Sequence, residues 1–363
     1  MIRLRKNILF MIVLAVFALF YIGCEGPAGS DGADGADGAD GADGADGVDG
    51  NVTCLVCHSD ENLAVKSAEF ASSSHFAGLV DDEREGTWSA GCVSCHTSEG
   101  FIEFADTGTN LGGIISGENE FECKTCHGLH QTFNAQDYAL RLTDAVAIFD
   151  GSNFALKGTN YLDVQGNSNL CANCHQSRRA EPNTTNPGES TFRITSTHYG
   201  PHHGAQANVV AGVGFAEIAG SVAYPAAGSS YHMAASCTGC HMNEGDHSFQ
   251  PSIDACNACH TTTDFNYGGV QDEISDLLDE LRDALVAAGV VEQGHEDIYE
   301  INQETGLIEL VSYAGEYHPV VGTFPMTHAR AFFNWIGLVE DRSLGAHNPK
   351  YVEALIKNSI DAM

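Results

Sequence analysis

The chain has 363 residues, enough for one large domain or two ordinary ones, and a formal net charge of −33 from 16 Lys and Arg against 49 Asp and Glu. This balance argues against nucleic acid as a partner, because the release of counterions that drives such binding needs Lys and Arg. Seven of the acidic residues lie in one short segment, so the net charge of the rest of the chain is less negative than the total suggests.

Residues 1–23 predict a signal for export. Arg3, Arg5 and Lys6 form a basic start, and Ile8–Ile22 is an unbroken apolar run. A run of about fifteen residues is short for a transmembrane helix, which needs about 20. Its end, Y-I-G-C, resembles the lipobox of bacterial lipoproteins, in which the cysteine, here Cys24, becomes the lipidated N-terminus. The alternative is an ordinary signal peptide followed by a chance cysteine.

Residues 24–50 form a linker in which every third residue from Gly26 to Gly50 is glycine. The period is collagen-like, but the segment has one proline and no basic residue, and its aspartates repel one another. We expect an extended, lipid-anchored tether that holds a domain away from a membrane. A short trimerising stalk is the alternative.

Residues 51–265 contain six C-x-x-C-H motifs, which take up twelve of the 13 cysteines. This spacing is typical of covalent haem attachment: the two thiols, about one helical turn apart, add to the two vinyl groups, and the histidine ligates the iron. One motif alone would also suit zinc or a redox C-x-x-C pair, but six of them in an exported chain predict six haem c groups. The cysteines are Cys54, Cys57, Cys92, Cys95, Cys123, Cys126, Cys171, Cys174, Cys237, Cys240, Cys256 and Cys259, and the proximal histidines are His58, His96, His127, His175, His241 and His260.

The remaining histidines are numerous enough to supply a second ligand to every iron. Eleven of the 17 histidines lie outside the motifs, whereas methionine is scarce beyond the signal. Methionine ligation raises the potential of a haem, and histidine ligation leaves it lower. The composition therefore favours low-potential haems with two histidine ligands.

The stretch YHMAASCTGCHMNEGDHSFQPSIDACNACH, followed by SLGAHNPKYVEALIKNSIDAM, resembles the C-terminal part of the superfamily of cytochrome c nitrite reductase and hydroxylamine oxidoreductase, and related electron-transfer cytochromes. The resemblance covers roughly residues 225–363. It implies that His232 ligates the haem of the sixth motif, that His347 ligates the haem of the fifth motif, and that His247 ligates a haem attached earlier in the chain. His328 is the alternative to His347 as the ligand of the haem of the fifth motif.

The same resemblance extends to the distal ligands of the earlier haems. It implies that His75 ligates a later haem and that His130, three residues after the third motif, ligates a neighbouring one. In THYGPHHG, His198 and one of His202 or His203 are the remaining candidates. Each of these histidines could instead be a surface or structural residue.

The fold class we expect is mainly α and irregular, a loop-rich protein organised around six haems with a helical C-terminal third, residues 266–363. Apolar residues fall on one helical face over Gln271–Gly289, and a second helix is predicted over about Pro325–Val339. A third helix should have Asn348 as N-cap and Pro349 at its first position. This region is expected to pack on the haems and to supply a distal ligand.

Three functions are compatible with these features. We expect an exported, lipid-anchored electron relay in the periplasm or at the cell surface, with redox proteins or an extracellular acceptor as partners. The first alternative is a reductase of nitrite, hydroxylamine or another small oxyanion or sulfur species. It needs one open haem, which Arg178, Tyr199 and His202 would line, but the C-x-x-C-K motif of nitrite reductase is missing. The second alternative is a homo-oligomer or the subunit of a cytochrome filament.

Overall fold

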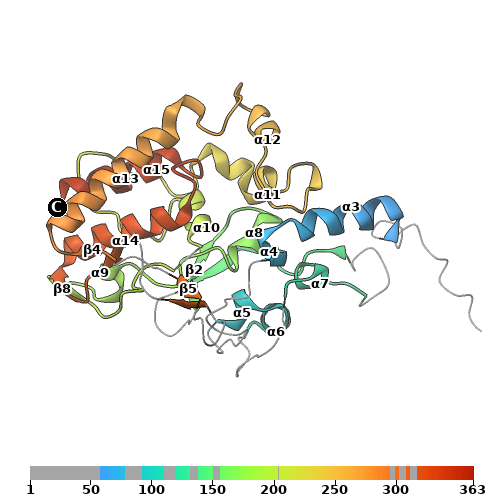
Figure 1. Cartoon of the computed structure of the whole chain (residues 1–363), viewed down its shortest axis with the longest axis horizontal. Coiled ribbons are helices and arrows are strands. Elements are labelled where there is room, and N and C mark those ends of the chain that lie inside the picture. Colours follow the sequence, from blue (N-terminus) through green and yellow to red (C-terminus); the bar gives the residue numbers. More distant parts are fainter. Residues whose placement is uncertain are drawn as a thin grey trace, which may run out of the picture. The chain divides into compact units, whose positions relative to one another are not determined.

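The computed structural model describes residues 58–77, 92–109, 120–130, 138–149, 156–202, 204–294, 299–301, 308–310 and 317–363. Residues 50–363 form one compact unit (Figure 1). The predicted signal, Cys24, the glycine-repeat linker, Cys54, Cys57 and His203 lie outside the described residues.

Short helices joined by loops make up the region of the motifs. Of the helices described there, most span a single turn or two, and α3 and α6 reach 10 residues or more. Side chains cap several of them: the hydroxyl of Thr97 accepts from the Gly100 N–H at the start of α6, and Ser252 does the same for Ala255 in α12. The helices are α3 (Asp60–Ala71), α4 (Ser74–Ala77), α5 (Val93–His96), α6 (Ser98–Thr107), α7 (Cys123–Cys126), α8 (Ser168–Ala172), α9 (Pro182–Thr185), α10 (Gln206–Ala211), α11 (Ser236–His241) and α12 (Ile253–Asn257), with 3-10 turns at Tyr231–Ala234, Asn243–Gly245 and Tyr267–Gly269.

Within the described residues, four antiparallel strand pairs add short ribbons to this framework. They are β1 (Val146–Phe149) with β2 (Leu156–Leu162), β3 (Thr191–Ile194) with β8 (Gly322–Pro325), β4 (Val291–Gln293) with β7 (Tyr317–Pro319), and β5 (Tyr299–Ile301) with β6 (Ile308–Leu310). The β3–β8 pair joins the motif region to the C-terminal helices. None of these pairs was predicted, and five of the strands lie after residue 290, so the last third of the chain is helical only in part.

The three helices predicted for the C-terminal region are present: α13 (Val270–Ala287), α14 (Met326–Asp341) and α15 (Pro349–Asp361). In α13 the buried side chains of Ile274, Leu278, Leu281 and Leu285 recur at helical spacing, as the sequence indicates. Asn348 precedes α15 as expected, but its side chain does not cap the helix. Its amide instead donates to the carbonyls of α10, at 3.1 Å and 3.3 Å.

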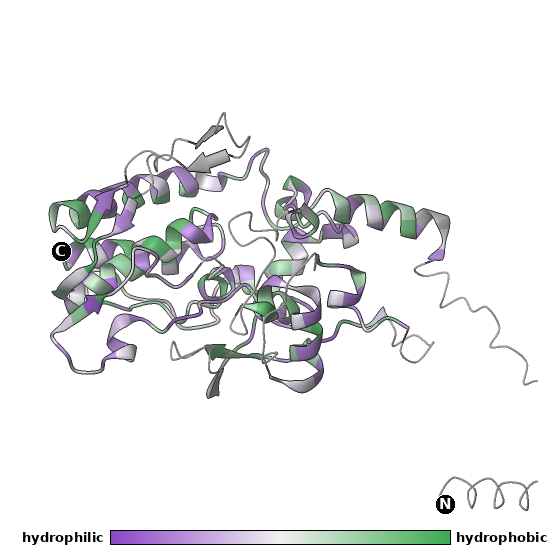
Figure 2. Ribbon diagram, turned by 60° about the horizontal axis from the view of Figure 1, so that its bottom comes forward, coloured by the Kyte–Doolittle hydropathy of each residue, from purple (hydrophilic) through white to green (hydrophobic). Residues whose placement is uncertain are grey.

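The largest hydrophobic core lies among α13, α14 and α15 and includes Leu281, Phe332, Trp335, Tyr351 and Leu355. The three helices carry hydrophobic and hydrophilic residues on different faces (Figure 2). A smaller core joins β1, β2, α8 and α10. Within the part of the chain that the structure describes, no helix is long and apolar enough to cross a membrane.

Candidate functional site

Four of the described motifs share one backbone geometry, a tight turn that returns from the histidine to the first cysteine. The histidine N–H donates to the carbonyl of that cysteine at 3.1 Å for His96, 3.0 Å for His127, 2.9 Å for His175 and 2.9 Å for His260. The fifth motif lies within α11. Residues three and four apart on a helical turn share a face, so both thiols and the imidazole are presented together. None of the ten cysteines that the structure describes forms a disulfide.

Each motif histidine faces one histidine from another part of the chain. The two rings of every pair lie at nearly the same separation, although the angle between their planes ranges from 14° to 89°. The distances between ring centroids are 5.9 Å for His58–His130, 5.9 Å for His175–His75, 6.1 Å for His96–His202, 6.4 Å for His127–His247, 6.3 Å for His241–His347 and 6.2 Å for His260–His232.

This separation fits a haem iron between the rings. A bond from a metal to an imidazole nitrogen is about 2 Å, so two imidazoles on opposite sides of one ion have ring centroids roughly 6 Å apart. Two histidine rings in direct van der Waals contact would lie closer together. The pairs and the thiols beside them are therefore a suitable donor set for covalently attached haem.

Backbone and side-chain acceptors orient many of these rings through Nδ1. At four histidines the acceptor is a backbone carbonyl: that of Tyr138 for His127 (2.6 Å), of Phe249 for His241 (2.9 Å), of Gly245 for His247 (2.9 Å) and of Ala346 for His232 (2.5 Å). His175 contacts the Gln206 side chain at 3.2 Å, and His347 contacts the Asp341 carboxylate at 2.7 Å. A carbonyl can only accept, so Nδ1 must carry the proton in the first group. Nε2 is then left as the ligand atom.

Burial keeps several of the imidazoles in the neutral form that binds metal. It lowers the pKa of His75 to about 4, with smaller contributions from the neighbouring His175 and His241. Burial also lowers the pKa of His127 and His175. At His347 burial acts in the same direction, but the charge of Asp341, its hydrogen bond and a contribution from Cys237 together outweigh burial and raise the pKa of that imidazole.

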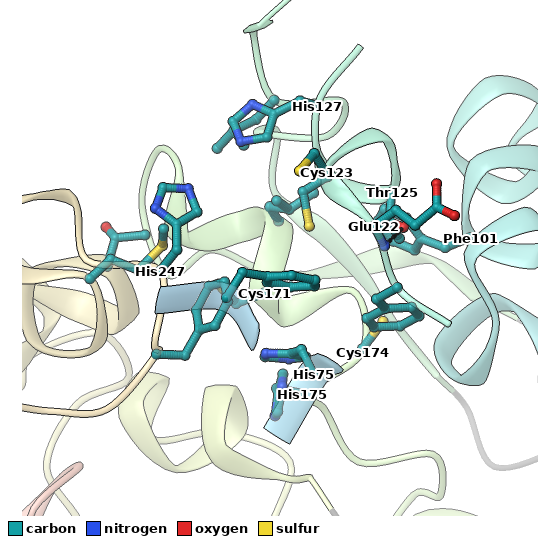
Figure 3. Close-up of a pocket in the computed structure, with 18 of the residues that line it drawn as sticks. His75, Phe101, Glu122, Cys123, Thr125, His127, Cys171, Cys174, His175 and His247 are labelled. Atoms are coloured by element: carbon teal, nitrogen blue, oxygen red, sulfur yellow. Dashed lines mark hydrogen bonds between the residues drawn. The ribbon is translucent and has the colours of Figure 1, made fainter. Parts of the chain in front are cut away.

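A cavity of about 1470 Å³ connects most of these groups. It is lined by His58, by the cysteines and histidines of the second, third and fourth motifs, and by the histidines that face these four motif histidines. Apolar side chains such as Phe70, Phe101 and Leu170 complete the lining. Figure 3 shows His75 and His175 side by side near Cys174, with His247 and His127 on another side of the cavity. The interior is thus large, mostly apolar and bordered by paired imidazoles, which are properties that would suit bound haem.

The loop THYGPHHG supplies one facing histidine. His202 lies opposite His96, whereas His198 is exposed, away from the cavity lining. His202 has a positive φ of 75°, and His130 has one of 55°, a backbone conformation that non-glycine residues rarely adopt. Strained backbone of this kind often accompanies a functional constraint.

Two residues of the alternative open site, Arg178 and His202, line the cavity, and the third, Tyr199, does not. Tyr199 is buried in the core against Phe192 and Phe332, where burial raises the pKa of its hydroxyl. His202 faces the ring of a motif histidine. Sequence reasoning missed Asp341 and Gln206, because an acidic or amide residue at a helix end is usually a solvated one.

The chain is similar in sequence to a known polyhaem cytochrome. No protein-family model matches the chain. The chain is 27% identical over 332 residues to the C-type polyheme cytochrome OmcB from two strains of Geobacter sulfurreducens, in matches that cover 74% of this chain and 43% of the relative. It therefore spans less than half the length of these relatives. It is also similar to the crystal structure of the outer cell wall cytochrome OcwA, with a TM-score of 0.46, 14% identity, and coverage of 81% of this chain and 49% of that one. The sequence similarity supports a multihaem c-type cytochrome.

Proposed function

From this relationship we propose that the chain is an exported hexahaem cytochrome c that relays electrons, with each iron held between a motif histidine and the histidine that faces it. The observation that carries the proposal is the set of six histidine pairs at one common separation. Bound haem would supply a one-electron couple at each position. Two histidine ligands would keep the potentials low.

Contacts between the motifs support a continuous relay. The thiol of Cys95 lies 3.8 Å from the carbonyl of Asn173, and the thiol of Cys174 lies 3.8 Å from the carbonyl of Ser94. The second and fourth motifs are therefore neighbours, although about eighty residues separate them.

Further contacts connect the third, fifth and sixth motifs to this pair. The hydroxyl of Ser98, just after the second motif, lies 2.6 Å from the hydroxyl of Thr125 within the third motif. The hydroxyl of Ser168, just before the fourth motif, lies 3.1 Å from that of Thr238 within the fifth. His232, which faces the sixth motif, contacts the residue before His347, which faces the fifth. We propose that electrons cross the protein along this series of adjoining sites.

A reductase is less well supported than a relay. Catalysis on a small oxyanion needs one iron with an open face. Every motif histidine in this chain faces a second histidine, so the geometry offers six closed sites.

We also propose that lipidation at Cys24 and the acidic linker hold the relay at a membrane, in the periplasm or on the cell surface, where a redox protein or an extracellular acceptor would meet it. Membrane fractionation tests this part. The wild-type protein should sediment with membranes, and Cys24→Ser should be released as a soluble protein that keeps its haems; retention of the variant in membranes would contradict the proposal.

Haem content and electron paramagnetic resonance test the relay. A pyridine haemochromogen assay should give six haems per chain. The oxidised protein should show only low-spin signals, as expected for two histidine ligands. A high-spin signal that responds to nitrite or hydroxylamine would instead favour the reductase.

A further inference from the structure

We propose that Asp341 lowers the reduction potential of the haem attached at Cys237 and Cys240, by accepting a hydrogen bond from its ligand His347. This inference rests on the proposed function, in which His241 and His347 ligate that iron. It assigns to a residue outside the attachment motifs an effect on the reduction potential of one haem.

Asp341 is the last residue of α14, and its side chain is only 1% exposed. One carboxylate oxygen lies 2.7 Å from Nδ1 of His347, and the other accepts a hydrogen bond from the hydroxyl of Ser343. The hydroxyl of Ser343 in turn accepts from the backbone N–H of His347 at 3.3 Å. The carboxylate is thus fixed in position by both of its oxygens.

The charge of this acceptor distinguishes His347 from the other histidines with described Nδ1 contacts. The acceptors at His127, His175, His232, His241 and His247 are carbonyl or amide oxygens, which carry no net charge. His247 also has a carboxylate nearby, but Glu69 lies 4.0 Å from its Nδ1, beyond hydrogen-bond distance.

A carboxylate behind a metal-bound histidine increases the basicity of the ligand. A more basic ligand stabilises the ferric iron more than the ferrous one, and hydrogen bonding around the ligands is one of the means by which a protein sets haem potential. Reduction adds one electron, which the fixed negative charge opposes. Burial strengthens this effect, since a charge in a low-dielectric interior is screened less than one in water. The position at the carboxyl end of α14 adds the negative end of the helix dipole.

The test is a redox titration of the full haem-loaded protein, with dithionite as reductant and the low-spin signals followed separately. Asp341→Asn keeps the shape of the side chain and removes its charge. It should move one midpoint to a more positive value, by about a tenfold change in the one-electron reduction constant, or about 59 mV. Ser343→Ala leaves the carboxylate without its hydroxyl donor and should move the same midpoint in the negative direction.

Two controls make the outcome specific. Glu340→Gln removes the same charge from the adjacent residue; if it moves that midpoint as far as Asp341→Asn does, the hydrogen bond is not the cause and the inference is overturned. His347→Met identifies the haem, because the signal that changes to His–Met ligation should be the one that Asp341→Asn moves. If His347→Met alters no signal, the proposed ligation fails. If it alters one whose midpoint Asp341→Asn leaves in place, only the role of Asp341 fails.

Discussion

Single histidines in this chain are positioned by two contacts, the ring that each faces and the acceptor behind it. His241 illustrates both, since it faces His347 and its Nδ1 contacts the carbonyl of Phe249 at 2.9 Å. An imidazole fixed in this way loses little side-chain entropy when it binds a metal, because its rotamer is already selected. The expected effect of replacing such a residue is a local change at one iron.

His202 and His198 form a matched pair for testing this expectation. His202→Met should convert the haem of the second motif from two histidine ligands to one histidine and one methionine, which raises its potential. The near-infrared charge-transfer band and a redox titration would report the change. His198→Met should alter neither, because His198 is exposed outside the cavity lining. If His198→Met changes the band and the potential and His202→Met does not, His198 is the ligand instead.

His247 provides a test of long-range ligation. It faces His127 of the third motif, with ring centroids 6.4 Å apart, although its nearest motif in the sequence is the fifth. His247→Met should change the ligation of the third haem and leave the haems of His241 and His260 spectroscopically intact. In a background that lacks the third haem, Cys123→Ser with Cys126→Ser, the same substitution should have no spectroscopic effect. An effect that persists there would show that His247 ligates another iron.

The sequence identifies the motif ligands directly, because attachment chemistry fixes them next to the cysteines. Facing ligands are harder to identify from sequence, since each pair joins segments that only the tertiary fold brings together. His198 and His202 are four residues apart in one loop, and composition does not distinguish them. The positive φ of His202, which turns the chain at that point, is visible only in the structure.

Among the secondary-structure elements, the helices with a clear apolar period were predictable and the ribbons were not. α13 carries its buried residues at helical spacing over 18 residues, so the period alone identifies it. Strands of three or four residues, such as β4 and β7, contain too few positions to show an alternating pattern. Their pairing depends on the tertiary fold.

α14 also depends on one buried polar residue, Asn334, for its position in the fold. Its amide donates to the Ala216 carbonyl at 2.9 Å and to the Ser359 hydroxyl at 3.0 Å, and its carbonyl accepts from the Ala216 N–H at 2.8 Å. These bonds tie α14 to α15 and to the loop after α10.

Asn334→Ala should therefore lower the free energy of unfolding by about 2–4 kcal/mol, because it removes these bonds and leaves buried backbone groups unpaired. The thermal midpoint of the haem-loaded protein measures the effect. Lys350→Ala, at an exposed position of α15, should change stability by less than about 0.5 kcal/mol. A loss below about 1 kcal/mol at Asn334 would mean that water replaces the bonds.

At the scale of the whole molecule, the interior has two parts of different composition. The C-terminal part is filled by hydrocarbon and aromatic side chains from α13, α14 and α15. The part around the first four motifs contains the cavity of about 1470 Å³, and few of its residues belong to a buried hydrophobic cluster. The sequence indicates this division through the position of the motifs, but it does not reveal that the C-terminal core consists of side chains packed on one another.

This division predicts how the protein behaves without haem. In a haem-free preparation, amide hydrogen exchange should remain slow in α13, α14 and α15, since their core consists of side chains packed on one another. Exchange should become fast in α5, α7 and α8, because the apolar walls of the cavity lie apart from one another and would be left facing water without haem. The haem-loaded protein, measured in parallel, should protect both regions. Uniformly fast exchange would show that the C-terminal core needs the haems to fold, and uniform protection would show that the cavity walls hold their structure without them.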